Sequence, residues 1–335
     1  MKKVTIQDVA HKAGVSKSTV SQYLNQRFEY MGVETKEKIE IAIKELNYQP
    51  NILARSLKQK KTLTVGIIVA NILHHYSTQV CRAIEDFFQG HNYHVIICNA
   101  DDNPEKERKY IEMLRAKQVD GLIIVPTGEN RELYKRLVAE NYPLVFMDRK
   151  VEGININNVI LNNRLAVHAA VFHFVEHGHK KIAMITRTPK VSVREERIKG
   201  YFEALEHHFL GNDVEFLRTT ELENIQHEFA RLMELKSPPT ALLVGNDLVL
   251  MEVLKGVKKG RVAIPKQLSI LTFDEVNFAE LYDPPISTIA QPAYEMGTKA
   301  AELLLDQING KQMEESRDYL FEGILHIRES IASLK

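Results

Sequence analysis

VTIQDVAHKAGVSKSTVSQYLN, residues 4–25, decides how the amino-terminal part of this chain folds. Thr5 precedes a run with helical apolar spacing and is followed three residues later by Asp8, which is the pattern of a capped helix start. Gly14 then supplies a residue that adopts a left-handed backbone at little cost, so this helix should end near it. The stretch therefore predicts a first short helix followed by a tight glycine turn.

A second short helix is predicted from Lys17 to about Leu24, with Ser16 as its cap. Val20 and Leu24 are four residues apart and should pack on the first helix. The opposite face is polar and holds no acid, which fits the DNA major groove, where phosphates accept from Lys and Ser and base edges pair with amides. An ordinary solvated helical hairpin is the alternative explanation of the spacing alone. The candidates for DNA contact in this stretch are Thr5, Ser16, Lys17, Ser18, Thr19, Ser21, Gln22 and Asn25.

The same residues, DVAHKAGVSKSTVSQYLN, resemble the amino-terminal motif of the lactose and galactose repressor family (LacI/GalR). The resemblance continues along the chain in GHKKIAMI, RIKGYFEAL, TALLVGND, LSILTFDE and PPISTIAQP. It implies a DNA-binding transcription regulator, most often a repressor, that binds a roughly palindromic double-stranded operator as a homodimer and responds to a small-molecule effector. It also implies three parts: a helix-turn-helix domain over 1–48, a hinge helix or linker over 49–62, and an effector-binding and dimerisation domain over 63–335.

The segment NYQPNILARSLKQKKT, residues 47–62, is basic and interrupted by proline. By composition alone it is a linker, and a solvated tether remains the alternative. The resemblance implies a hinge helix that folds when two chains lie side by side on DNA. Asn51, Ala54 and Leu57 occupy the matching positions, with Leu57 as an apolar wedge in the minor groove.

From Thr64 onward, short apolar runs alternate with amphipathic stretches of helix length, which is typical of parallel sheets covered on both faces. The expected strands are VGIIVA, HVIICNA, DGLIIV and PLVFMD, followed after about residue 160 by KKIAMI, VEFL, TALLVG and LSILTF. The predicted fold class is α/β: a small all-helical head, completed by a third helix over 32–46, and a two-lobed body like that of periplasmic binding proteins. A small ligand is expected in the cleft between the lobes, at the carboxyl ends of the strands.

Composition narrows the function. Residues 1–61 contain 12 Lys and Arg against 6 Asp and Glu, while the remainder contains 32 against 38, so a basic head precedes an acidic body. The two cysteines lie in apolar segments without metal-ligand spacing, and no apolar run is long enough to span a membrane. No catalytic motif is present, so we expect no enzyme activity, cofactor or metal site. We expect a cytoplasmic protein, with a sugar-binding transport protein as the competing class.

Polar residues at strand ends are the candidates for effector binding. The resemblance implies that Asp148 accepts from ligand hydroxyls and that Arg197 donates to two ligand oxygens. Arg187 stands where a glycine is common in the family, and histidines replace apolar residues near position 74. The expected effector contacts are His75, Tyr76, Asp148, Arg149, Arg187, Arg197, Asn246, Asp274 and Gln291.

The chemistry of the effector is suggested by these donors. Several arginines and histidines in one cleft favour an anionic ligand, and SQYLNQRFEYM is similar to the branch of the family that regulates ketodeoxygluconate use. A six-carbon sugar acid is therefore predicted, with Arg187 or Arg197 holding its carboxylate, Asp148 and Asp274 taking hydroxyls, and His75 or Tyr76 covering one side. A neutral sugar or a corepressor is the alternative.

Overall fold

A computed structural model describes residues 4–25, 27–29, 31–49, 61–208, 216–311 and 316–335. The chain divides into two compact units, Met1–Thr62 and Leu63–Lys335, called here the head and the body. The hinge candidates Asn51, Ala54 and Leu57 lie outside the described residues, so their role stays a prediction.

The head is a helical unit whose start and turn confirm the predicted local chemistry. The hydroxyl of Thr5 accepts from the backbone of Asp8, whose carboxylate accepts from the backbone N–H of Thr5, which forms the predicted capping box. Gly14 ends the first helix with φ 66°. Val20 and Ile39 are fully buried in a core shared by all three helices. The helices are α1 (Ile6–Ala13), α2 (Lys17–Leu24) and α3 (Val33–Glu45).

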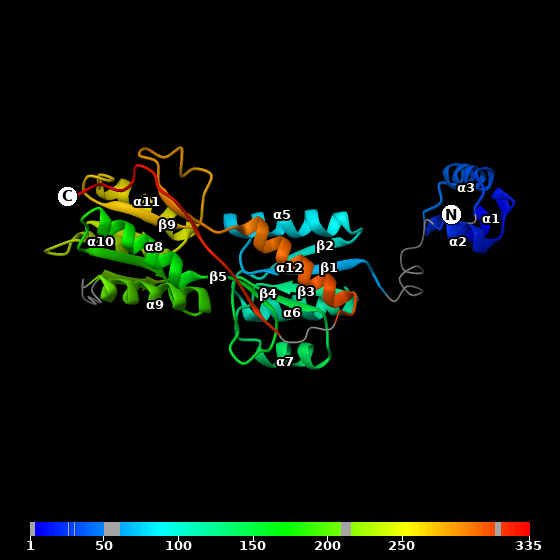
Figure 1. The fold of residues 1–335 in the computed structure, drawn as a ribbon, viewed down its shortest axis with the longest axis horizontal. Coiled ribbons are helices and arrows are strands. Elements are labelled where there is room, and N and C mark those ends of the chain that lie inside the picture. Colours follow the sequence, from blue (N-terminus) through cyan, green and yellow to red (C-terminus); the bar gives the residue numbers. More distant parts are fainter. Residues whose placement is uncertain (1–3, 26, 30, 50–60, 209–215, 312–315) are drawn as a thin grey trace. The chain divides into compact units, whose positions relative to one another are not determined.

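Lobe 1 of the body is built on a six-stranded, wholly parallel sheet in the order β11-β5-β4-β3-β1-β2. One face is covered by α5 and α12 and the other by α6 and α7 (Figure 1). The strands are β1 (Thr64–Val69), β2 (His94–Asn99), β3 (Gly121–Ile124), β4 (Leu144–Met147), β5 (Asn158–Leu161) and β11 (Asp318–Phe321). The helices are α5 (His75–Gly90), α6 (Pro104–Ala116), α7 (Arg131–Ala139) and α12 (Ala293–Ile308).

Lobe 2 repeats this arrangement in the order β12-β10-β9-β8-β6-β7, with β12 antiparallel to β10 and the other pairs parallel. Helices α10 and α11 cover one face and α8 and α9 the other. The strands are β6 (Ile182–Arg187), β7 (Leu217–Thr220), β8 (Ala241–Val244), β9 (Ser269–Phe273), β10 (Ser287–Ala290) and β12 (Ile324–His326). The helices are α8 (Asn163–Glu176), α9 (Ser192–His207), a 3₁₀ turn η2 (Leu222–Asn224), α10 (Ile225–Met233) and α11 (Asp247–Gly260).

The chain passes between the lobes three times: after β5, after β10 and after β11 (Figure 1). The apolar runs of the sequence did not predict β5, β10, β11 or β12. Of the strand predicted at VEFL, residues 214–215 lie outside the described residues, and β7 begins at its last residue, Leu217. The four unpredicted strands have only three or four residues each, and the edge strands β11 and β12 are largely exposed or half-buried, so their apolar signal is weak. Each lobe is consequently built from segments that lie far apart in the sequence.

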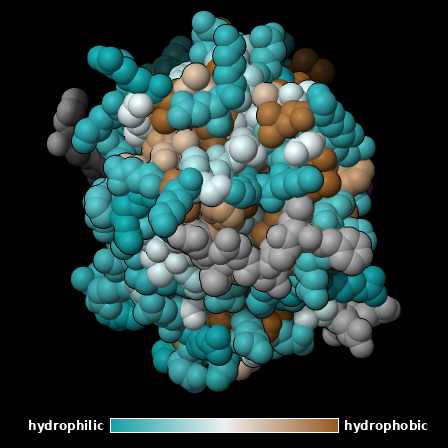
Figure 2. Space-filling model, turned by 90° about the vertical axis from the view of Figure 1, so that its left-hand side faces the viewer, coloured by the Kyte–Doolittle hydropathy of each residue, from teal (hydrophilic) through white to brown (hydrophobic). Residues whose placement is uncertain are grey.

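One face of the body has a mainly polar surface. Figure 2 shows small groups of hydrophobic residues among hydrophilic ones on this face, which is ordinary for a water-exposed surface. Along the described part of the chain, no helix combines the length and apolar character needed to cross a bilayer.

Candidate DNA-binding and effector sites

In the head, the predicted DNA-contacting residues lie on and around α2. Lys17, Ser18 and Gln22 are exposed, and Ser18 and Gln22 lie on the side of α2 away from the buried Val20. The hydroxyl of Ser16 caps α2 by accepting from the backbone of Thr19. Three of the predicted residues, Thr19, Ser21 and Asn25, are half-buried.

Thr5 and Asn25, at the two ends of this region, make hydrogen bonds that close the helices. Thr5 forms the capping box of α1, and the amide nitrogen of Asn25 donates to the carbonyl of Ser21 at 2.7 Å, which closes the end of α2. Their side chains therefore organise the helices, while Lys17, Ser18 and Gln22 remain exposed on α2.

In the body, two aspartates occupy matched positions in the two lobes. Asp148 follows β4 and Asp274 follows β9, and these strands are third in the order of their respective sheets. Both residues have a left-handed backbone, with φ of 65° and 70°, a conformation that aspartate tolerates better than most residues other than glycine. Burial raises the pKa of both carboxyl groups, although neighbouring arginines oppose this shift. The repeated turn thus brings two carboxyl groups to the cleft between the lobes.

Arg197 of α9 interacts electrostatically with both acids and is almost completely buried. Its Nε donates to the side-chain oxygen of Asn163 at 2.8 Å and its Nη1 to the carbonyl of Gly245 at 2.6 Å. Its guanidinium group stacks on Phe273, 3.8 Å from the ring centre. Burial lowers the pKa of Arg197, and the two aspartates counteract that effect. The side chain is held in one orientation by two hydrogen bonds and a ring.

The other predicted contacts from lobe 2 and the crossover have definite partners. Asn246 is the N-cap of α11, and its side-chain oxygen accepts from the backbone N–H of Val249 at 2.9 Å. The amide nitrogen of Gln291 donates to Asp274 at 2.6 Å, and its oxygen is buried without a hydrogen-bond partner among the described residues. On the lobe 1 side the ring of Tyr76 is buried and also faces the cavity.

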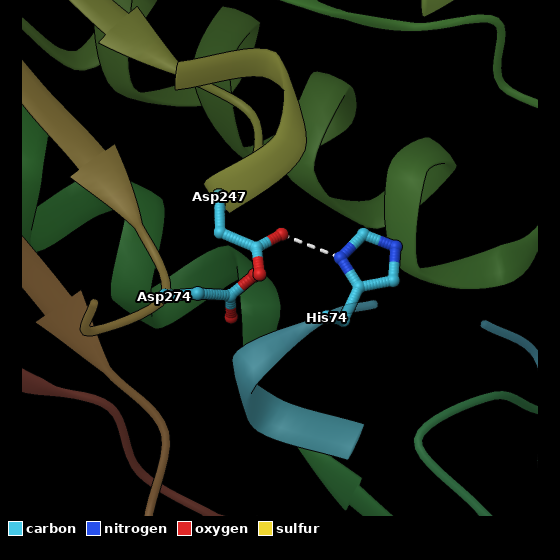
Figure 3. Close-up of side chains that lie close together, drawn as sticks. All are labelled: His74, Asp247 and Asp274. Carbon is cyan, nitrogen blue, oxygen red and sulfur yellow. Dashed lines mark hydrogen bonds and ion pairs between the residues drawn. The ribbon is translucent and has the colours of Figure 1, made fainter. Parts of the chain in front are cut away.

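A histidine from lobe 1 joins the lobes at this point. Figure 3 shows the imidazole of His74 directed at the carboxylate of Asp247, with Asp274 beside it. The Nδ1 of His74 lies 2.5 Å from Asp247, and the backbone N–H of His75 donates to the other oxygen at 2.9 Å. Burial alone raises the pKa of Asp247, but these hydrogen bonds and the charge of His74 lower it overall. An ionised carboxylate only accepts, so Nδ1 of His74 carries the proton.

His74, Asp247 and Asp274 are also the described residues whose metal-ligand atoms lie together, within 4.8 Å of one another. One nitrogen and two carboxylates are a possible donor set for a divalent cation. However, the short contact between His74 and Asp247 places a proton between two of those donors. The geometry is therefore that of a hydrogen-bonded bridge between the lobes.

A second bridge centres on Asp102, which the sequence analysis missed. Asp102 lies 2.7 Å from Arg149 of its own lobe, 3.0 Å from Arg187 and 3.3 Å from Arg194, both in lobe 2. Arg187 also approaches Glu221 at 3.6 Å. Asp102 follows the strand β2 closely, so the strand-end rule that singled out Asp148 applied equally to it.

The structure therefore brings most of the expected effector contacts together, but not all of them. A cavity of about 50 Å³ between the lobes is lined by His74, Tyr76 and Ser77 of lobe 1 and by residues of lobe 2. His75 and Arg187 do not line it. A wider hollow of about 890 Å³ adjoins the cavity and is lined largely by loops. The expected contacts that line the smaller cavity are Tyr76, Asp148, Arg149, Arg197, Asn246, Asp274 and Gln291.

Comparison with known proteins agrees with this architecture. Residues 5–51 match the model of bacterial regulatory proteins of the lacI family, and residues 171–331 match the periplasmic binding protein-like domain. The chain is 43% identical over 336 residues to the probable HTH-type transcriptional regulator EndR of Paenibacillus polymyxa, covering 98% of this chain and 99% of that protein. The chain belongs to the LacI family of bacterial regulatory proteins.

Two further relatives of this LacI-family chain bear on its function. It is 32% identical to the HTH-type transcriptional regulator KdgR of Bacillus subtilis over 310 residues, covering 91% of each protein. A crystal structure of the lac repressor dimer bound to operator and the anti-inducer ONPF aligns with a TM-score of 0.87 and 25% identity, covering 99% of this chain and 100% of that one. The predicted family and fold class are thus confirmed, and the chain is a DNA-binding transcription regulator.

Proposed function

We propose that this LacI-family chain acts as a homodimeric repressor that binds a palindromic operator and releases it when a sugar or sugar acid enters the body. The observation that carries the effector part is the convergence of Asp148, Arg197 and Asp274 on one cavity between the lobes. Two buried acceptors flanking a fixed guanidinium suit a ligand with several hydroxyl groups, because each hydroxyl both donates and accepts. The similarity to KdgR and to the operator-bound lac repressor dimer supports the operator and dimer parts.

The narrowness of the cavity supports a coupling between ligand and lobe movement. About 50 Å³ is far below the ~300–1,000 Å³ of typical small-molecule sites. A six-carbon ligand therefore requires the lobes to separate or rotate before it enters. An effector that binds one lobe arrangement more tightly shifts the population toward it, and that difference in affinity is the signal.

On the DNA side, the exposed face of α2 is proposed to enter the major groove, with Lys17 and Ser18 on phosphates and Gln22 on a base edge. Leu57 is proposed as the minor-groove wedge, on the strength of the family resemblance alone. Leu57→Ala should then weaken operator binding and DNA bending and leave effector affinity unchanged. If bending and affinity both persist, residues 49–62 act as a tether.

The test is to select operators from randomised DNA with the full chain and to measure binding with and without sugars, sugar acids, sugar phosphates and purines. We expect a palindromic site bound by a dimer and weakened by a six-carbon compound. Asp274→Asn should abolish the response to effector and retain DNA binding. Failure to enrich any DNA site, with sugar binding retained, would favour a sugar-binding transport protein instead. Tighter operator binding with a purine or sugar would establish a corepressor.

A further inference from the structure

The bridge around Asp102 has an unusual charge arrangement. Three guanidinium groups, from Arg149, Arg187 and Arg194, surround one carboxylate at 2.7 to 3.3 Å. The side chains are largely removed from water, with exposures of 7% for Arg149, 10% for Arg194 and 18% for both Arg187 and Asp102. Each arginine presents a fork of donors that matches a planar carboxylate.

One aspartate does not satisfy all of these donors. The Nε–H groups of Arg149 and Arg187 are buried and have no hydrogen-bond partner among the described residues. The Oδ1 of Asp102 lies near Arg149 without hydrogen-bond alignment. Buried donors without acceptors are costly, so this cluster can accept a further or better-placed anion.

The pKa values of the cluster reflect the three positive charges that lie within 3.3 Å of Asp102. Burial, followed by the charges of Arg149 and Arg187, lowers the pKa of Arg194 to about 10. Although burial opposes it, the close positive charge of Arg149, followed by the charges of Arg194 and Arg187, lowers the pKa of Asp102 to about 2. Two more acids approach the cluster, Asp148 at 3.6 Å from Arg149 and Glu221 at 3.6 Å from Arg187. Both distances exceed hydrogen-bond length.

The cluster is within reach of the effector. Arg149 and Arg194 line the cavity together with Asp148 and Arg197, so a ligand held by its hydroxyls has two guanidinium groups at its side. Arg197 has a different surrounding, because its Nε and Nη1 already donate to Asn163 and Gly245. The cluster therefore has more donor capacity for a carboxylate than Arg197 has.

We propose that Arg149, Arg187 and Arg194 form a carboxylate-binding site, that Asp102 occupies it as an internal substitute in this conformation, and that the carboxylate of a sugar-acid effector replaces Asp102. This inference rests on the proposed effector role of the cavity. Asp102 belongs to lobe 1, whereas Arg187 and Arg194 belong to lobe 2. When the ligand carboxylate replaces Asp102, the contact of Asp102 with Arg187 and Arg194 between the lobes is lost, and the ligand contacts these arginines instead. The acid therefore binds the two lobe arrangements with different affinities.

The test compares two neighbouring substitutions in the full chain, Asp102→Asn and Asp101→Asn. Both residues have a left-handed backbone that asparagine tolerates, with φ of 53° and 54°, but Asp101 is exposed and bonds Lys106. Thermal unfolding is followed in acetate and in chloride at equal ionic strength. Removal of the internal carboxylate should make Asp102→Asn bind acetate at least tenfold more tightly than Asp101→Asn does. Equal responses of the two variants would overturn the proposal.

Further arms identify the anion and separate this inference from the proposed function. D-gluconate should stabilise Asp102→Asn far more than the uncharged polyol sorbitol does, and a tighter response to inorganic phosphate than to acetate would overturn the carboxylate assignment. If Asp102→Asn does not fold, Arg187→Gln is measured instead. This substitution should reduce the preference of the chain for gluconate over sorbitol at least tenfold. An unchanged preference would refute the carboxylate-binding site. Operator binding is measured on the same preparations. Operator release by neutral sugars without an anion effect removes this inference only, whereas an anion effect without operator binding removes the proposed function.

Discussion

Replacement of His74 by glutamine should destabilise the closed cleft, and replacement of the adjacent His75 should not. The imidazole of His74 reaches Asp247 across the cleft, whereas His75 contributes its backbone N–H, which a substitution keeps. The two side chains of the bridge are 13% and 6% exposed, so solvent screening is small. The pair His74→Gln and His75→Gln is therefore a matched test of one contact.

The size of the destabilisation by His74→Gln depends on the hydrogen bonds that Asp247 keeps in the variant. Removing one partner of a buried ion pair costs ~3–5 kcal/mol when the remaining charge is left without compensation. Here the carboxylate keeps the N–H groups of His75 and Leu248, at 2.9 and 2.7 Å, and lies in the first turn of α11, whose dipole favours an anion. The loss should therefore be that of one hydrogen bond to a charged group, about 1.5–3 kcal/mol.

For a unit of this size, each kcal/mol shifts Tm by roughly 2–4 °C, so His74→Gln should lower the Tm of the body by about 3–12 °C. Circular dichroism on the full chain measures it, with His75→Gln expected within about 2 °C of the parent protein, the shift of a ±0.5 kcal/mol surface change. A double-mutant cycle with Asp247→Asn isolates the pairwise energy. Equal effects of the two histidine substitutions, or additive effects in the cycle, would refute the bridge.

Three further predictions address other parts of the molecule. Gln22→Arg on the exposed face of α2 should shift one operator position from A·T toward G·C by roughly 1–3 kcal/mol, measured by selection from randomised sites; an unchanged base means that Gln22 is not a reader. The pKa of Asp102 is about 2 in the folded chain against ~3.9 unfolded, so its stabilisation is present above pH ~4 and lost as pH falls toward 2, and acid unfolding of Asp102→Asn should lack this component. Gly200→Ala places a methyl group 2.9 Å from the backbone of α8 and should cost roughly 1–3 kcal/mol in denaturant unfolding, whereas Gly90→Ala has open space and should cost nothing.

Local chemistry predicted the head well because its determinants are close in sequence. Thr5 with Asp8, Gly14 and Ser16 each act within one helical turn, and the structure confirms all three caps. The central strands were equally predictable, since strands buried on both faces read as continuous apolar runs. The central part of each sheet is therefore predictable from the sequence alone.

The missed features depend on distance along the chain. Asp102 meets partners at positions 149, 187 and 194, and no periodicity within one segment encodes such a meeting. Which of the two histidines reaches lobe 2 depends on where α5 begins. His74 is the residue just before the helix, and its ring contacts Asp247 of lobe 2. Asn246 was expected at the cleft and does line it, yet its side-chain oxygen is committed to capping α11. The order of strands in the sequence predicts which residues lie at the cleft, but their hydrogen-bond partners are known only from the three-dimensional structure.

Two separate bridges, His74 with Asp247 and Asp102 with its arginines, hold the lobes nearly shut around the cavity. If each contributes about 1.5–3 kcal/mol, together they favour this arrangement by ~3–6 kcal/mol, or roughly 10²- to 10⁴-fold. A ligand that bound both arrangements equally would shift nothing, however tightly it bound. An acid that takes over the arginines of Asp102 while its hydroxyls engage Asp148 and Asp274 acts on one of these bridges directly. A small effector is then sufficient, because the free energy that favours this lobe arrangement comes from a few buried contacts, and the effector replaces one of them.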